Sequence, residues 1–312
     1  MKKNKKYLVT GAAGFIGSKI AKKLLERGSK VWTIDNLSTG FADNIPNEVE
    51  YLYGNCFDEK IVNKLKNVKF DAIVHFAGQS SGEISFEDPV YDLRTNTEST
   101  LRLINYGLNN NCNRFIYAST MSVYGKVPDI PINENHITKP ISFYGIGKLA
   151  SENYLHKYSK RGLIPTTLRI FNVYGPGQNL GNMKQGMVSI YLSQMIKNKS
   201  IIVKGSKKRF RDFIHVDDVV KTTIKSISKE NSFNKIYNVG TGIKLTVEEL
   251  LEKLIEAYGE NISIKYDKPT PGDQFGIYSD NRLLKKDLNV ESFIDFKKGI
   301  KDMLNWAIHH EK

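Results

Sequence analysis

The sequence predicts an α/β fold in which a doubly wound parallel sheet is joined to a smaller C-terminal α/β lobe. Short apolar runs alternate with amphipathic stretches through the first half of the chain, which is the pattern of repeated βαβ units. A glycine-rich turn joins the first run to the first amphipathic stretch. The chain has 312 residues, 40% of them hydrophobic, which favours two lobes sharing one cleft.

The expected strands are short and apolar or β-branched, as buried parallel strands are. They cover residues 7–10, 31–34, 72–76, 115–118 and 166–170. Between them, apolar residues recur at three- and four-residue spacing, which predicts amphipathic helices. The helices cover residues 16–27, 90–109 and 144–160.

The alternation stops after these strands, where Gly175-Pro176-Gly177 breaks the chain and a helix is expected at 187–197. Residues 216–228 and 236–239 then resemble one more helix and strand of the sheet, so the chain crosses between lobes more than once. The predicted sheet domain is 1–172 plus about 215–240, and the predicted second lobe is about 173–214 plus 241–312.

Composition excludes several classes of function. The net charge of +13 would attract acidic partners, but lysines are scattered along the whole chain, so no nucleic-acid partner is expected. No apolar run approaches the ~20 residues that span a bilayer, and residues 1–6 are too short for a signal peptide. Cys56 and Cys112 form no CxxC pair, so neither a disulfide nor a metal site is expected. The predicted location is the cytoplasm.

The segment Gly11-Ala12-Ala13-Gly14-Phe15-Ile16-Gly17 lies where the backbone must turn tightly and approach a pyrophosphate at a helix N-terminus. A side chain at the glycines would block that approach. The second strand leads to Asp35, at the distance where an acid hydrogen-bonds the adenosine ribose. Because Asp35 would repel a 2′-phosphate, this Rossmann pattern predicts NAD rather than NADP.

Tyr144 and Lys148 are four residues apart on an expected helix, so both project from one face. The nearby ammonium is expected to lower the pKa of the phenol, which could then accept the proton of a substrate hydroxyl. Thr120, just beyond the fourth expected strand, is the third candidate catalytic residue. Its hydroxyl would hold the substrate oxygen.

The Gly-x-x-Gly-x-x-Gly spacing with Tyr-x-x-x-Lys resembles the extended, sugar-modifying branch of the short-chain dehydrogenase/reductase superfamily, over nearly the whole chain. Matching motifs imply one set of cofactor-binding residues. It comprises Gly11, Gly14, Phe15, Ile16, Gly17, Asp35, Asn36, Ser38, Asn55, Cys56, Phe76, Ala77, Gly78, Gln79, Asn96, Tyr144 and Lys148. Asn55-Cys56 departs from the usual aspartate and aliphatic residue beside adenine.

The residues after Thr120 discriminate between reactions of this family. The family's dehydratases and decarboxylases carry a carboxyl residue here, because loss of water or carbon dioxide needs an acid. This chain resembles neither, since it has Met121 and Ser122, which cannot shuttle a proton as a carboxyl group can. The segment 120–125 most resembles the nucleotide-sugar 4-epimerases. The resemblance implies a UDP-hexose or UDP-N-acetylhexosamine substrate. A net nucleotide-sugar dehydrogenase or ketoreductase and an NAD-sensing binding protein remain as alternatives.

Two further blocks resemble the family's diphosphate-binding segments and imply that Asn172 and Arg211 contact substrate, together with Thr120. Arginine suits this role because its planar fork donates paired hydrogen bonds to phosphate. The family usually has a second arginine where Thr270 stands, and Arg209 is the expected replacement. The basic segment 207–211 is either a solvated turn or a ligand contact.

Two expectations concern sugar size and assembly. Registered on Gly272-Asp273, Ile277 falls where a tyrosine restricts some epimerases to plain hexoses, so it is the expected size gate. Family members commonly pair through the helices corresponding to 90–109 and 144–160, which implies a homodimer.

Overall fold

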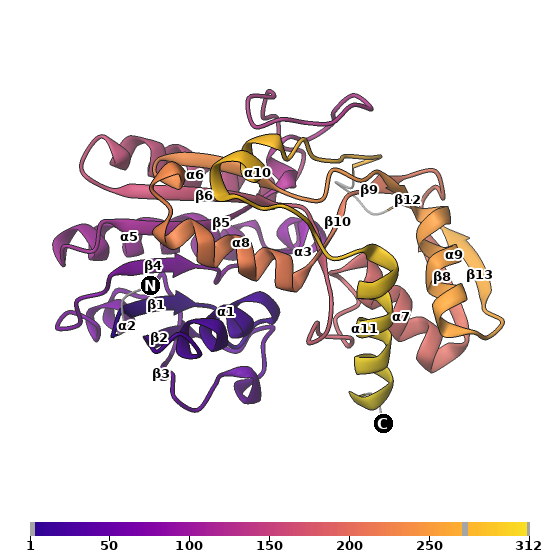
Figure 1. The fold of residues 1–312 in the computed structure, drawn as a ribbon, viewed down its shortest axis with the longest axis horizontal. Helices are drawn as coiled ribbons and strands as arrows, with labels where there is room; N and C mark the ends of the chain where they lie inside the picture. Colours follow the sequence, from indigo (N-terminus) through magenta and orange to yellow (C-terminus); the bar gives the residue numbers. More distant parts are fainter. Residues whose placement is uncertain (1–3, 270–273, 311–312) are drawn as a thin grey trace.

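The computed structural model describes residues 4–269 and 274–310. A seven-stranded sheet of order β11-β6-β5-β4-β1-β2-β3 forms its centre, and all its neighbouring strands run parallel (Figure 1). The strands are β1 (Lys6–Thr10), β2 (Lys30–Asp35), β3 (Glu50–Tyr53), β4 (Ala72–His75), β5 (Arg114–Thr120), β6 (Ile164–Ile170) and β11 (Lys235–Val239). The predicted fold class is confirmed. The sequence prediction missed β3, an edge strand without a fully buried residue.

Helices cover both faces of the sheet, which explains why its central strands are buried along nearly their whole length instead of alternating between buried and exposed residues. On one face α1 (Phe15–Leu25), α8 (Val216–Ser228) and α10 (Arg282–Leu288) bury their apolar residues against the strands. On the other, α2 (Glu59–Asn63), α5 (Ser99–Asn109) and α6 (Phe143–Ser159) do the same. The expected boundary assigned 241–312 to the second lobe, but Leu284 and Leu288 of α10 pack in the core of the sheet domain.

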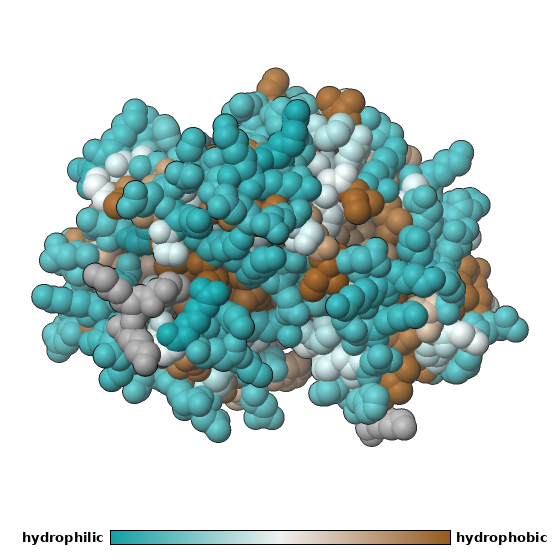
Figure 2. Space-filling model, viewed as in Figure 1, coloured by the Kyte–Doolittle hydropathy of each residue, from teal (hydrophilic) through white to brown (hydrophobic). Residues whose placement is uncertain are grey.

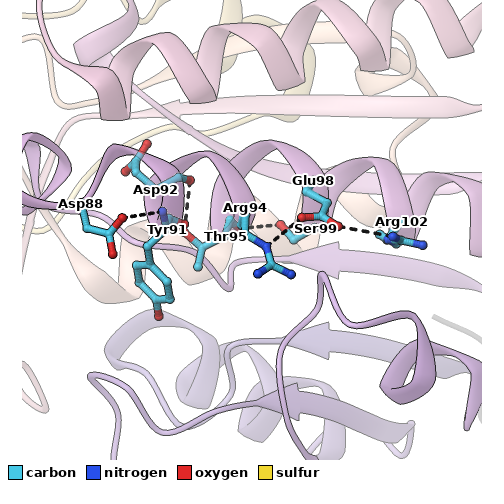
Figure 3. A network of polar contacts seen from close by, with 8 residues as sticks. All are labelled: Asp88, Tyr91, Asp92, Arg94, Thr95, Glu98, Ser99 and Arg102. Carbon is cyan, nitrogen blue, oxygen red and sulfur yellow. Dashed lines mark hydrogen bonds and ion pairs between the residues drawn. The ribbon is translucent and has the colours of Figure 1, made fainter.

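The expected helix 90–109 consists of three consecutive pieces. These are α4 (Pro89–Leu93), a π-helical turn η2 (Arg94–Glu98) and α5. Asp88 caps α4 by accepting a hydrogen bond of 2.8 Å from the Tyr91 backbone N–H (Figure 3). Such wide turns occur mostly at functional sites, and this one carries Thr95 and Asn96.

The second lobe lies to the right of the sheet in Figure 1. It contains α7 (Met187–Asn198), α9 (Val247–Tyr258) and α11 (Phe296–His310), with β8 (Ser200–Lys204) paired to β13 (Ser263–Asp267). Leu192, Leu250 and Met303, one from each helix, meet in its core. The lobe therefore has an apolar core separate from the two that cover the sheet.

Two short strand pairs link the lobes: β7 (Asn172–Tyr174) with β10 (Phe213–His215), and β9 (Phe210–Arg211) with β12 (Leu245–Thr246). Between β9 and β10, the fully buried Asp212 carboxylate accepts hydrogen bonds from the backbone N–H groups of Thr241, Gly242 and Ser279. Several donors to one buried carboxylate satisfy its charge and fix these segments relative to one another.

No helix within residues 4–269 and 274–310 is long and apolar enough to cross a bilayer. On the face drawn in Figure 2, hydrophilic residues dominate and apolar ones form small separate groups. The same described residues contain no cluster of three or more histidine, cysteine or acidic side chains placed to hold a metal ion.

Candidate active site

A cleft of about 740 Å³ runs along the carboxyl ends of the sheet strands and continues between the two lobes. Open parallel α/β sheets bind ligands at this edge, because strand ends and helix N-termini leave backbone groups free there. The glycine turn, Asp35 and Thr120 line it from the sheet domain, and Asn172 and Arg211 line it from the opposite side. The cleft thus joins the segments that the sequence assigned to cofactor and substrate.

Most residues of the predicted site line this cleft. They are Gly11, Gly14, Phe15, Ile16, Gly17, Asp35, Asn36, Ser38, Asn55, Cys56, Phe76, Ala77, Gly78, Thr120, Tyr144, Lys148, Asn172, Arg209 and Arg211. Gln79, Asn96 and Ile277 lie behind its wall.

The glycine turn has the geometry that a pyrophosphate needs. Gly11 has φ of 78°, and a Cβ there would lie 2.8 Å from the Ala77 backbone nitrogen. A Cβ on Gly17 would lie 2.1 Å from the Gly11 carbonyl oxygen. Gly14 caps α1 without any side chain, so the first N–H groups of the helix remain available to a ligand at the cleft. These residues fit a dinucleotide.

The Asp35 carboxylate is held at the carboxyl end of β2. It is 9% exposed and accepts hydrogen bonds from the backbone N–H groups of Ala13, at 2.9 Å, and Leu37, at 2.8 Å. Carboxylate oxygens can each accept more than one bond, so Asp35 can also bind ribose hydroxyls. A 2′-phosphate at that position would place two negative charges together.

The predicted adenine side is neutral and polar. Asn36 donates a hydrogen bond of 2.7 Å to the Asn55 side-chain oxygen and accepts one of 3.0 Å from the Ser38 backbone N–H. Cys56 is 6% exposed, and burial raises the pKa of its thiol to about 12. Cys56 therefore lines the cleft as an uncharged side chain.

The structure brings Thr120, Tyr144 and Lys148 together where β5 meets α6. Ser142 caps α6 by accepting a hydrogen bond of 3.1 Å from Gly145, which places Tyr144 in the first turn at the cleft. Thr120 is the last residue of β5; its hydroxyl lies 3.2 Å from that of Ser122 and lowers the pKa of the Tyr144 phenol slightly. The Lys148 Nζ lies 5.9 Å from the centre of the Tyr144 ring.

The expected lowering of the Tyr144 pKa is wrong. Burial raises the pKa of Tyr144 to about 12, against a smaller lowering by the Thr120 hydroxyl. Burial also lowers the pKa of Lys148 to about 8, although Asp92 and Glu152 oppose this shift. Helical spacing predicted the positions of the two groups, but the loss of water on burial is the largest effect on the pKa of each.

On the substrate side, the Asn172 side chain donates a hydrogen bond of 3.2 Å to the Asp212 carbonyl oxygen. Arg211 is 3% exposed and donates to the carbonyl oxygens of Gln274, at 2.7 Å, and Phe275, at 3.2 Å. Arg209, 6% exposed, donates to the Lys204 carbonyl oxygen. Both arginines line the cleft while they also fix loops. Thr270 and the Gly272-Asp273 pair lie outside the described residues.

Three predicted site residues have other surroundings. Ile277 is 1% exposed and packs in an apolar cluster with Phe171 and Tyr124, so it is not at the cleft surface as a size gate must be. Asn96 is fully buried and donates a hydrogen bond of 3.0 Å to the Gln79 carbonyl oxygen. These last two residues support the cleft wall from behind.

Sequence reasoning missed a group of charged residues that line the cleft. Lys204 of β8 lies 3.8 Å from Glu83 of α3 (Gly82–Glu87), so this ion pair crosses between the lobes. Lys184 also lines the cleft and pairs with Glu87 at 2.6 Å. No sequence motif indicated these residues, because their partners lie on segments far away in the chain.

Comparisons with known proteins agree with this geometry. A family model described as the NAD dependent epimerase/dehydratase family matches residues 7–240. A UDP-glucose 4-epimerase of Mycolicibacterium smegmatis is 30% identical over 300 residues, which cover 94% of this chain and 95% of that protein.

Solved structures are similar over nearly the whole chain. The UDP-glucose 4-epimerase of Thermotoga maritima, with UDP-glucose, has a TM-score of 0.95 and 32% identity, covering 98% of this chain and 100% of that one. The UDP-N-acetylglucosamine 4-epimerase of Methanobrevibacter ruminantium has a TM-score of 0.92 and 29% identity, covering 99% and 100%.

Proposed function

The chain belongs to the NAD dependent epimerase/dehydratase family, and we propose that it inverts C4 of a UDP-linked hexose or N-acetylhexosamine. One observation carries this proposal: Thr120, Tyr144 and Lys148 share a single cleft with the glycine turn and with Asn172 and Arg211. A reacting sugar carbon held between these groups would lie within reach of both the cofactor and the phenol. The relatives named UDP-sugar 4-epimerases support the choice of reaction.

NAD, which the glycine turn and Asp35 would hold, would supply a reversible hydride acceptor for C4 of the sugar. The chain supplies the proton chemistry. The reacting form of Tyr144 is the phenolate, which accepts the proton of the C4 hydroxyl as the carbon is oxidised and donates it back after the sugar has turned. Thr120, which lines the same cleft, would orient the substrate oxygen. Lys148 stabilises the phenolate that forms when Tyr144 has lost its proton.

The substrate diphosphate would lie between Asn172 and Arg211, the polar groups that line the far side of the cleft. Arg211 is suited to this because its charge persists while its carbonyl contacts hold it in one orientation. Arg209 would supply the second cation. Remote binding of this kind leaves the hexose free to rotate while the nucleotide remains held.

The side chains that follow Thr120 favour epimerisation over elimination. Met121 and Ser122 begin the turn η3 (Met121–Val123), and Ser122 lies with its hydroxyl 3.2 Å from that of Thr120. Neither can act as the carboxyl acid that loss of water or carbon dioxide requires. A net dehydrogenase or ketoreductase would use the same three groups, so stoichiometry decides between them.

The test incubates the purified protein and NAD with UDP-, GDP-, dTDP- and CDP-sugars, and follows each by proton NMR and by cofactor absorbance. We expect a UDP-hexose or UDP-N-acetylhexosamine to equilibrate with its C4 epimer without net change in the reduced cofactor. Steady accumulation or consumption of NADH with turnover would instead establish a net redox enzyme. Binding of NAD without turnover of any sugar would favour a sensing protein.

We also propose that the protein is a homodimer and acts in the cytoplasm. Val90 and Leu93 of α4 and Ile146 of α6 are 67%, 56% and 52% exposed, on two helices that contact one another. Apolar side chains gathered on neighbouring helices are typical of an interface between subunits. Cys56 and Cys112 are both buried free thiols, which suits a reducing compartment.

A further inference from the structure

A buried carboxylate lies behind the catalytic groups without taking part in the proposed reaction. Asp92 of α4 is 1% exposed, and its Oδ1 accepts hydrogen bonds from the side-chain amides of Gln79, at 2.8 Å, and Asn96, at 3.1 Å. Both donors are neutral. Burial of an ionised carboxylate without a cationic partner is costly, so this position needs a physical reason.

The second oxygen of Asp92 faces α6 at the residue that precedes Lys148. A Cβ on Gly147, the preceding residue of α6, would lie 3.3 Å from the Asp92 Oδ2. Figure 3 shows the side chains of Asp92 and Tyr91 leaving α4 in opposite directions. Tyr91 lines the cleft, whereas Asp92 lies on the other side of the helix. Its carboxylate therefore acts on α6 and not on the ligand.

Two carboxylates, those of Asp92 and Glu152, raise the pKa of Lys148 against the effect of burial. Glu152 is already paired with a cation: Arg169 donates to it at 2.7 Å and 3.0 Å, and both side chains are buried. The charge of Glu152 is thereby offset. Asp92 has only amide donors among the described residues, so its negative charge is left to act on Lys148.

We propose that Asp92 is a positioning residue that keeps the Lys148 ammonium protonated beside Tyr144. The inference rests on the proposed function for its consequence in turnover, but the charge pair itself does not. A Lys148 that lost its proton could not stabilise the Tyr144 phenolate, so the effect of Asp92 would reach the reaction through Lys148 alone.

The other titratable groups around this pair do not supply the charge. His75 of β4 is neutral, because burial and the Lys148 charge lower its pKa to about 3. Tyr117 of β5 lies under the Lys148 Nζ, 5.0 Å from its ring centre, and burial raises the pKa of its phenol. Burial raises the pKa of Asp92 itself to about 6, with Gln79, Lys148 and Asn96 opposing the shift. At pH 7 to 8, above this pKa, Asp92 carries a negative charge while His75 and Tyr117 are uncharged.

The direct test measures the pKa of Lys148 without turnover. The protein is labelled with ¹³C at the lysine ε-carbon, loaded with NAD and titrated by NMR, and Lys148→Arg identifies the signal. Asp92→Asn keeps an oxygen for the two amide donors while it removes the charge. We expect the pKa of Lys148 to fall by at least about one unit in this variant, as it does on losing a neighbouring opposite charge. An unchanged pKa would overturn the proposal.

The kinetic test follows the pH profile of kcat. In Asp92→Asn the alkaline limb of the kcat profile should move to lower pH by at least about one pH unit. The KM for the UDP-sugar should be unchanged. Asp88→Asn is the matched control: it makes the same change at the exposed cap of the same helix, where asparagine caps equally well, so it should leave the limb in place. In a Lys148→Arg background Asp92→Asn should not move the limb, because arginine stays charged.

An equal loss of kcat at every pH, with the limb unmoved, would mean that Asp92 only supports the fold and would overturn the proposal. If Asp92→Asn fails to fold, Asp92→Ser, which leaves room for water, is titrated in its place. A shifted Lys148 pKa in a protein that turns over no UDP-sugar would sustain the charge pair and reject the proposed function instead. The two failures are thus distinguishable.

Discussion

The Lys148 ammonium donates a hydrogen bond of 2.9 Å to the carbonyl oxygen of Ala118, a buried residue of β5. The same strand ends at Thr120, which lines the cleft together with Tyr144. This bond therefore ties α6 to β5 at the place where the reacting groups face the cleft. Groups fixed before substrate binds need not be ordered during the reaction, which lowers its barrier.

Replacement of Tyr144 by phenylalanine should lower kcat at least about a hundredfold, because it removes the group that accepts the substrate proton. NAD should remain bound, since the glycine turn and Asp35 are untouched. Tyr158→Phe, at the other end of the same helix, is the matched control and should retain activity. Near-normal turnover by Tyr144→Phe would remove the phenol from the mechanism.

The protein should bind NAD much more tightly than NADP. Asp35 is held by the Ala13 and Leu37 backbone N–H groups with its charge facing the ribose site, and a 2′-phosphate there would be repelled. Calorimetry on protein freed of nucleotide measures both affinities. Asp35→Asn should narrow the difference between the affinities for NAD and NADP. Equal affinities in the unaltered protein would contradict the assignment of Asp35 to the ribose.

The product should have the same mass as the substrate, because no carboxyl side chain follows Thr120. Mass spectrometry of each converted nucleotide sugar measures this directly. A product lighter by one molecule of water would show that another group in the cleft supplies the acid. Glu83 would then be the first residue to replace, since its carboxylate also lines the cleft.

Stability should fall in acid through His75. This residue is 1% exposed, and its Nδ1 lies 2.7 Å from the Thr10 hydroxyl. Burial lowers its pKa from 6.5 to about 3, so below pH 6.5 the unfolded chain binds a proton that the folded protein cannot. Stability is therefore lost as pH falls from 6.5 towards 3. The loss amounts to about 2 kcal/mol by pH 5, at about 1.36 kcal/mol per pH unit.

Thermal unfolding at pH 7 and pH 5 checks this effect. His75→Gln should show a smaller difference between the two conditions than the unaltered protein, because glutamine has no proton to gain. His309→Gln, on the exposed end of α11, is the control and should behave as the unaltered protein does. The same pH dependence in all three proteins would exclude His75 as its source.

Light scattering should report a dimer at micromolar concentration. Val90→Asp, which places a charge among the exposed apolar residues of α4 and α6, should give a monomer. Ile243→Asp changes an equally exposed isoleucine outside these helices and should leave the dimer intact. A monomer in the unaltered protein would reject the proposed assembly.

Much of the site followed from local patterns. The glycine spacing predicted a tight turn at Gly11, and the four-residue separation of Tyr144 and Lys148 predicted that both reach one face of a helix. Both features depend on backbone geometry within a few residues. The register that assigned Ile277 to the sugar pocket depended instead on how a loop of the second lobe packs. Its neighbours Tyr124 and Phe171 are distant in the chain, and they take it into a core.

The sequence by itself determined the βαβ order, the dinucleotide turn and the catalytic helix, because short-range sterics and periodicity control each of them. Only the tertiary structure decided the protonation of the groups around the catalytic helix. Burial shifts the pKa of Tyr144 upwards and that of Lys148 downwards, and of the two carboxylates that act on Lys148, Glu152 is paired with Arg169 whereas Asp92 has only amide donors among the described residues. These effects depend on how much water packing excludes and on which distant side chains it brings together, and neither quantity is encoded in local spacing.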